Sequence, residues 1–236
     1  MKISVCIFTY LRPQVLEEQL RAIREQTIPI DEIILGHLEN SKTPSFDFKD
    51  YKLIRFHFDP GLHSKFIVAS AIQPNTDFII MIDDDIIPGK KWIENCLTSY
   101  KEKEGAYGIL GFNLALNSPS GCIHSAGKEQ LNSKIAQVDF IGQGWFLHFK
   151  YLQYMWAEPM PFYNRSGGDD IWFGYQLYKH GIKSYIPPYP SNDQEMWGNK
   201  KMRAVEESLF LRGKFHNECR KRFVEIGTKK GWKSIK

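Results

Sequence analysis

The segment FIIMIDDDIIP, residues 78–88, decides the fold that the sequence predicts. Its first five residues are apolar without alternation, which is the pattern of a strand buried on both faces in a parallel sheet. The strand ends at three consecutive carboxylates, Asp83, Asp84 and Asp85. Because ligands of parallel α/β sheets bind at the carboxyl ends of strands, we expect a functional site at these carboxylates.

Strands and helices alternate around this segment in the first hundred residues. Short β-branched and aromatic runs predict strands at 3–8, 33–35 and 52–56, and apolar residues at helical spacing predict helices near 13–23, 62–69 and 92–97. This order predicts a mostly parallel sheet covered by helices. In the second half we expect strands at 109–116, 135–140 and 142–149, helices at 169–180 and 200–222, and loops at 117–127 and 185–192.

Composition indicates one globular domain. The 236 residues are 42% hydrophobic and 25% charged, which argues against disorder. No apolar run approaches the roughly 18–20 residues that span a bilayer, so we expect a cytoplasmic protein. Four widely spaced cysteines without a CxxC motif predict reduced thiols. We expect a single domain, 1–236, with a first half (1–100), a second half (101–199) and a basic helical tail (200–236).

The tail carries most of the positive charge. It holds twelve Lys and Arg against four Glu, a net charge of +8 in a chain whose total is +4, so residues 1–199 sum to −4. By charge the body is not a nucleic-acid-binding type. A basic helix with interleaved Leu, Phe and Trp suits peripheral contact with an anionic membrane. The alternative is a solvated helix that packs its apolar side on the body.

The Asp triplet predicts a divalent-cation site. Adjacent carboxylates repel one another, and a hard cation such as Mn²⁺ or Mg²⁺ relieves this repulsion through oxygen ligands. Such ions take one or two carboxylates and complete their shell with substrate phosphates. Two alternatives remain: a solvated acidic turn, or a helix cap made by Asp85.

The strand followed by the triplet resembles the DxD signature of the GT-A glycosyltransferases. Upstream, SVCIFTYLRP (4–13) is similar to the first strand and nucleotide-contacting turn of the family 2 enzymes. The segment 61–88 is similar to their stretch from a Gly-containing helix start to the DxD. The resemblance covers 1–100 well and 135–190 more loosely. It implies a GT-A, Rossmann-like α/β fold: a mostly parallel sheet flanked by helices, with a smaller mixed region on the acceptor side. It also implies that residues 1–100 form the nucleotide-sugar-binding half and that residues 101–199 form the acceptor-binding and catalytic half.

The resemblance also implies roles for individual residues on the donor side. Asp85 ligates the metal, and Asp83 contacts the ribose or the metal. Lys65 reaches a phosphate, although it stands where these enzymes often carry Arg, and an exposed helix Lys is the alternative. Glu39 follows the second strand, where an Asp is usual, and is able to accept the uracil N–H. The expected donor contacts are Thr9, Tyr10, Arg12, Glu39, Lys65, Asp83 and Asp84, with simple packing as the alternative for Tyr10.

A second carboxylate pair, Asp169 and Asp170, follows two glycines and begins a predicted helix. Glycines permit close backbone approach, and negative charge is favoured in the first helical turn, so a helix-start role is the alternative for Asp169. The motif is similar to the Gly-Gly-Glu-Asp of β-galactosyltransferases and the Glu-Asp of family 2 enzymes. The resemblance implies that Asp170 is the general base and that Asp169 binds or orients the acceptor. A base placed opposite the leaving diphosphate favours inversion of the anomeric carbon.

Histidines and tryptophans supply further candidates. GT-A enzymes often use a late His as an additional metal ligand, for which His124, His148 and His216 qualify; a surface or packing role is the alternative for each. Trp145 and Trp172 can stack on a sugar face, with burial in the core as the alternative.

The sequence therefore predicts a Mn²⁺- or Mg²⁺-dependent, inverting glycosyltransferase. It would move a sugar from a nucleoside-diphosphate sugar, with UDP as the expected nucleotide, to a glycan or lipid-linked acceptor in polysaccharide biosynthesis. A nucleotidyltransferase is the first alternative, but it needs a Gly-rich loop after the first strand, and residues 8–14 (FTYLRPQ) contain no glycine. A non-catalytic carbohydrate-binding protein of the same fold is the second, and the presence of both Asp pairs counts against it.

Overall fold

The computed structural model describes residues 1–9, 12–38, 51–72, 75–128, 130–162, 167–202 and 213–235. These residues form a nine-stranded sheet in the order β3-β2-β1-β4-β9-β6-β10-β8, with β7 paired to β6. The strands are β1 (Ile3–Thr9), β2 (Glu32–Leu38), β3 (Lys52–Phe56), β4 (Phe78–Ile82), β6 (Ala106–Leu114), β7 (Cys122–Ala126), β8 (Ala136–Val138), β9 (Phe140–His148) and β10 (Ser184–Ile186).

The sheet has a parallel half and a mixed half. Strands β3, β2, β1 and β4 run parallel to one another. Strand β9 is antiparallel to both β4 and β6, and β10 pairs parallel with β6 and antiparallel with β8. This confirms the predicted fold class, a mostly parallel α/β sheet with a smaller mixed region.

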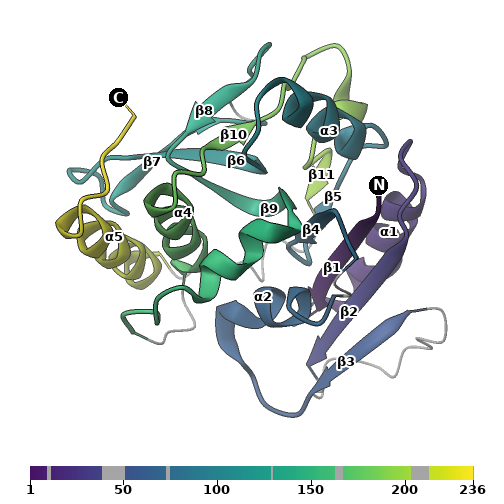
Figure 1. Cartoon of the computed structure of the whole chain (residues 1–236), viewed down its shortest axis with the longest axis horizontal. Coiled ribbons are helices and arrows are strands. Elements are labelled where there is room, and N and C mark those ends of the chain that lie inside the picture. Colours follow the sequence, from purple (N-terminus) through teal and green to yellow (C-terminus); the bar gives the residue numbers. More distant parts are fainter. Residues whose placement is uncertain are drawn as a thin grey trace.

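Helices cover both faces of the sheet, which explains why the central strands are apolar throughout. Along β1, the side chains of Ile3, Val5 and Ile7 pack with α1 and α3, whereas Cys6 belongs to the core cluster on the other face, with α2, α4 and α5. In Figure 1, α4 and α5 lie side by side at the end of the molecule opposite β3. The helices are α1 (Pro13–Arg24), α2 (Ser64–Ala69), α3 (Trp92–Glu102), α4 (Asp169–Lys179) and α5 (Lys214–Lys229).

Three elements differ from the sequence expectation. A strand, β7, occupies part of the expected loop at 117–127, and β10 occupies the start of the expected loop at 185–192. The helix expected at 200–222 is displaced: Lys201–Met202 form a short strand, β11, and α5 runs from Lys214 to Lys229. Helix α5 packs its buried residues on the body, as one of the two interpretations of the tail requires.

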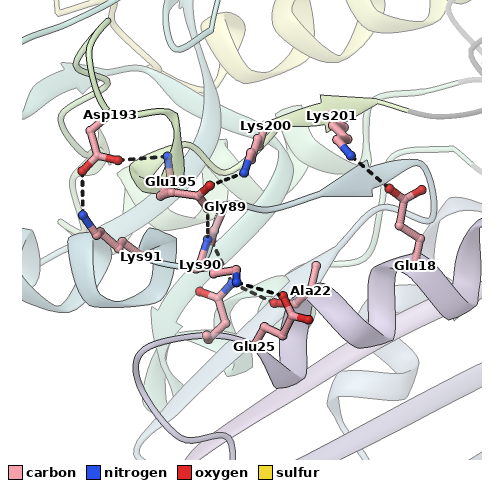
Figure 2. Close-up of polar contacts among 11 residues, drawn as sticks. Glu18, Ala22, Glu25, Gly89, Lys90, Lys91, Asp193, Glu195, Lys200 and Lys201 are labelled. Atoms are coloured by element: carbon pink, nitrogen blue, oxygen red, sulfur yellow. Dashed lines mark hydrogen bonds and ion pairs between the residues drawn. The ribbon is translucent and has the colours of Figure 1, made fainter.

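The chain between α4 and α5 returns to the nucleotide half and is held there by charged contacts (Figure 2). Lys91 binds Asp193 at 2.9 Å, and the backbone N–H of Lys90 donates to Glu195 at 3.0 Å. Glu195 also pairs with Lys200. Strand β11 then pairs antiparallel with β5 (Ile86–Ile87), which directly follows the Asp triplet. The return segment therefore lies against the expected site.

Two further expectations concern the environment of the chain. All four cysteines are free thiols, as predicted. Within the described ranges no helix has the length and apolar character needed to cross a bilayer.

Candidate active site

The Asp triplet lies at the carboxyl edge of the parallel strands, and its backbone is fixed from two sides. The Asp83 N–H donates to the carbonyl of Gln143 on β9 at 3.1 Å. From α1, the fully buried Gln19 side chain donates to the carbonyls of Asp83 and Ile86, each at 2.8 Å. These bonds hold the turn after β4 in one conformation, so the three carboxylates project from a rigid support.

In the described part of the chain, two cations face the triplet. Arg12, just before α1, contacts Asp84 at 2.5 Å and Asp85 at 3.5 Å. Lys65 of α2 contacts Asp83 at 2.8 Å. The Arg12, Asp84 and Asp85 side chains are each 11% exposed, so these are not solvated surface pairs. Burial would lower the pKa of Arg12, but the facing carboxylates raise it above its usual value.

Lys65 also joins the triplet to the second carboxylate pair. Its Nζ lies 3.0 Å from Asp169 Oδ2, on the first turn of α4, and 4.2 Å from the ring centre of Trp145. Burial favours the neutral amine, yet Asp169 and Asp83 together raise the pKa of Lys65. A single ammonium group thus brings together two Asp clusters that are far apart in the sequence.

Asp170 points to a different cation. Its Oδ2 accepts from Arg220 Nη1 of α5 at 2.9 Å, and its Oδ1 accepts from the backbone N–H of Ile171 at 2.9 Å. Gly142 of strand β9 lies beside Asp170 Oδ2, because a Cβ at Gly142 would be 3.3 Å from this oxygen. The absence of a side chain at Gly142 leaves room beside this carboxylate.

Among the described charged groups of the site, carboxylates outnumber cations. Five carboxylates, Asp83, Asp84, Asp85, Asp169 and Asp170, meet the cations of Arg12, Lys65 and Arg220, a formal net charge of −2 for these eight groups. Burial and then the charge of Asp83 raise the pKa of Asp85 to about 7. Burial also raises the pKa of Asp169. A further cation would relieve this excess.

Some of these carboxylates are suitable ligands for a hard divalent cation. Asp83 and Asp85 offer carboxylate oxygens, the ligands that Mg²⁺ and Mn²⁺ prefer. No group of three His, Cys, Asp or Glu able to hold a metal ion occurs in the described residues. The chain would therefore supply two carboxylates, and the phosphates of a ligand would supply the other oxygens, as is usual for Mg²⁺.

The three histidine candidates lie on three different elements. His148 pairs with Phe78 at the opposite end of β4. His124 of β7 contacts the carbonyl of Ala126. His216 of α5 is buried against the turn that begins α4, because a Cβ on Gly167 would lie 2.8 Å from its ring.

Other expectations have different outcomes. Thr9 ends β1 and is buried, and its hydroxyl has no hydrogen-bond partner within the described part of the chain. Tyr10 and Glu39 lie outside the described residues. Trp145 and Trp172 lie in the core, which is the packing role that the sequence favours over sugar stacking: each is only 1% exposed, and both belong to the same core cluster.

Sequence reasoning missed Gln19, Gln143 and Arg220. Gln19 falls on the apolar face of α1 beside Leu16, and a polar residue within such a stripe is a usable signal. Gln143 has a φ of 65°, unusual for a residue other than glycine, and nothing in the sequence except its flanking glycines pointed to it. Arg220 lies on the buried face of α5, and the sequence does not indicate which elements this helix contacts.

Comparison with known proteins supports the fold. No family model and no curated protein sequence matches the chain. Residues 1–349 of S. aureus TarS match with a TM-score of 0.57 at 12% identity, covering 80% of this chain and 59% of that one. The same fragment in complex with UDP matches with a TM-score of 0.57 at 13% identity, with the same coverage. A further crystal structure of S. aureus TarS matches with a TM-score of 0.55 at 14% identity, covering 80% of this chain and 37% of that one.

The chain thus spans about 59% of the TarS fragment. At this level of identity the likeness concerns the path of the backbone. The chain has the Rossmann-like α/β fold that it shares with S. aureus TarS.

Proposed function

We propose that this protein is a metal-dependent, inverting glycosyltransferase that transfers a sugar from a UDP-sugar to an acceptor hydroxyl. The observation that carries the proposal is the contact of Lys65 with both Asp83 and Asp169. It places a triplet suited to a cation and a diphosphate next to a carboxylate pair suited to a proton transfer. The UDP complex of the TarS fragment, which has the same fold, makes UDP the first nucleotide to test.

On the donor side, Asp85 and Asp83 would hold Mn²⁺ or Mg²⁺ together with the diphosphate oxygens. The bound cation would supply charge neutralisation for the departing diphosphate. Among the described residues, Arg12 and Lys65 are the cations that face the triplet, so they are the residues we assign to phosphate binding. Gln19 keeps the backbone of the triplet rigid while these contacts form.

On the acceptor side, Asp170 would accept the proton of the attacking hydroxyl. The hydroxyl oxygen forms the new bond to the anomeric carbon as the bond to the diphosphate oxygen breaks, and the proton passes to the carboxylate. One lone pair of each Asp170 oxygen accepts a hydrogen bond from the protein, which leaves others for the acceptor. Asp169, held by Lys65, would orient the acceptor.

The acceptor is a glycan or a lipid-linked saccharide in this proposal. The buried side of α5 contains Phe223, Val224 and Gly227, so this side packs within the protein, whereas Phe215 near the start of the helix is 59% exposed. Charged residues such as Lys214 and Arg222 remain exposed and are available for contact with an anionic membrane. Peripheral membrane contact remains a prediction.

Calorimetric titration with UDP, GDP, CMP, dTDP and ADP, with and without Mn²⁺, tests the donor assignment. We expect Mn²⁺-dependent binding of UDP that Asp85→Ala abolishes. Asp77→Ala is the matched control, because Asp77 lies at the opposite end of β4 and its side chain is 50% exposed. Failure of every nucleotide to bind would contradict the proposal and favour a carbohydrate-binding protein. Binding of a nucleoside diphosphate other than UDP would correct only the base.

A further inference from the structure

Helix α5 is fitted closely to the turn that begins α4. Gly167 and Gly168 have φ values of 135° and 104°, which favour glycine. A Cβ on Gly168 would lie 2.0 Å from the ring of Phe223. The C-terminal helix therefore packs directly on the backbone that leads into Asp169 and Asp170.

Arg220 is the charged residue of α5 that enters this contact. Its side chain is 12% exposed, and its Nη1 donates to Asp170 Oδ2 at 2.9 Å. Its Nη2 lies 3.6 Å from Cys122 Sγ, and the rings of Phe112 and Phe140 lie 5.3 and 5.7 Å from its guanidinium carbon. A guanidinium held by a carboxylate, a thiol and two rings has a fixed position, unlike a surface arginine.

The other groups around Asp170 do not replace this cation. On α4, Asp169 adds negative charge, and its own partner is Lys65. On α5, His216 faces Gly167, and Cys122 of β7 meets the guanidinium. Strand β9 contributes Gly142 and the ring of Phe140, and β6 contributes the ring of Phe112, so neither strand brings a charge. Among the described residues, Arg220 is the cation that contacts Asp170.

We propose that Arg220 is a positioning residue that holds the Asp170 carboxylate in the orientation that meets the acceptor, so that α5 completes the catalytic site. This inference rests on the proposed function. Without Arg220, Asp170 Oδ2 would lose the side-chain hydrogen bond that fixes it beside Gly142. The two hydrogen bonds, from Arg220 and from the backbone of Ile171, also fix the plane of the carboxylate.

The test compares Arg220→Met and Arg220→Lys with the control Arg222→Met, whose residue is exposed on the same helix over Phe162. The kcat and the donor KM of transfer or donor hydrolysis are measured for each variant. We expect Arg220→Met to lower kcat about tenfold or more with little change in the donor KM, because the carboxylate is no longer held toward the attacking hydroxyl. Arg220→Lys should recover part of the lost kcat, Arg222→Met should keep the wild-type kcat, and UDP affinity should stay unchanged in all three.

Carbon NMR of labelled aspartate, with the Asp170 signal assigned through Asp170→Asn, provides a readout that does not require activity. The Asp170 carboxyl signal should shift or broaden in Arg220→Met and keep its wild-type position in Arg222→Met, because, of these two arginines, Arg220 is the one that contacts this carboxylate. If Arg220→Met does not fold, Arg220→Gln carries the same comparison. An unchanged Asp170 signal in Arg220→Met, or a kcat equal to that of the wild type, would overturn the inference. A wild type without turnover would overturn the proposed function, while the NMR comparison would still decide whether Arg220 holds the Asp170 carboxylate in place.

Discussion

The substitution Lys65→Met tests how much the ammonium group of Lys65 contributes to the free energy of unfolding. Methionine keeps most of the volume and removes the charge, leaving Asp83 and Asp169 without the cation that contacts both. Lys65 and Asp169 are 13% and 7% exposed. Removing one partner of a buried ion pair costs about 3–5 kcal/mol, because the remaining charge is uncompensated. We therefore expect a loss of at least about 3 kcal/mol in the free energy of unfolding.

Urea denaturation with EDTA present measures this loss without interference from divalent cations. Lys90→Met is the matched control: its pair with Glu25 is 57% and 47% exposed, so the expected loss is below about 1 kcal/mol. Adding Asp169→Asn to Lys65→Met removes one stranded charge and should recover about 1 kcal/mol or more. A loss below about 1 kcal/mol in Lys65→Met, with no recovery in the double variant, would refute the bridging role.

Two further predictions concern the packing of α4 and α5. Gly168→Ala should lower the free energy of unfolding by more than about 3 kcal/mol, because its Cβ would lie 2.0 Å from the Phe223 ring. Gly181→Ala, with a φ of 75° and nothing within 4 Å of its Cβ, should lower it by only about 1 kcal/mol. Thermal unfolding compares the two variants, and equal losses would contradict the close fit of α5 on this turn. Hydrogen bonds from Lys179 and then from Lys230 lower the pKa of Glu158 to about 2, so its contribution to stability is present above the ordinary carboxyl pKa and is lost as the pH falls toward 2. Glu158→Gln should cost about 1 kcal/mol at neutral pH and nothing near pH 2, and a difference that does not depend on pH would count against this ion pair.

The parallel half of the sheet was predictable because each of its central strands is apolar along its whole length. Strand β4 shows the cause: Ile80 and Ile82 belong to one core cluster, and Ile79 and Met81 belong to the other. Strand β7 escaped prediction because Ile123 is exposed and the neighbouring residues do not alternate. Local pattern therefore identified the strands covered on both faces and missed one covered on one face.

The carboxylates of the site were predictable, but their partners were not. A triplet after a buried strand indicates a site whatever surrounds it, and two glycines before Asp169 indicate a special turn. The pairing of Arg220 with Asp170 depends on where α5 packs, which local sequence does not determine. The predicted helix ends at residue 222, whereas Phe223 and Val224 continue the buried face of α5.

The central proposal is that Asp170 acts as a base beside a metal-bound donor. Turnover of UDP-sugars by Asp170→Asn tests this role of Asp170 most directly. Release of UDP from a panel of UDP-sugars is measured with Mn²⁺ for the wild type, Asp170→Asn and the control Asp77→Asn. We predict that Asp170→Asn lowers turnover by about 10² to 10⁴ while leaving UDP affinity near that of the wild type, and that Asp77→Asn changes neither. Wild-type turnover in Asp170→Asn would contradict the assignment of the base and the catalytic role of the second carboxylate pair.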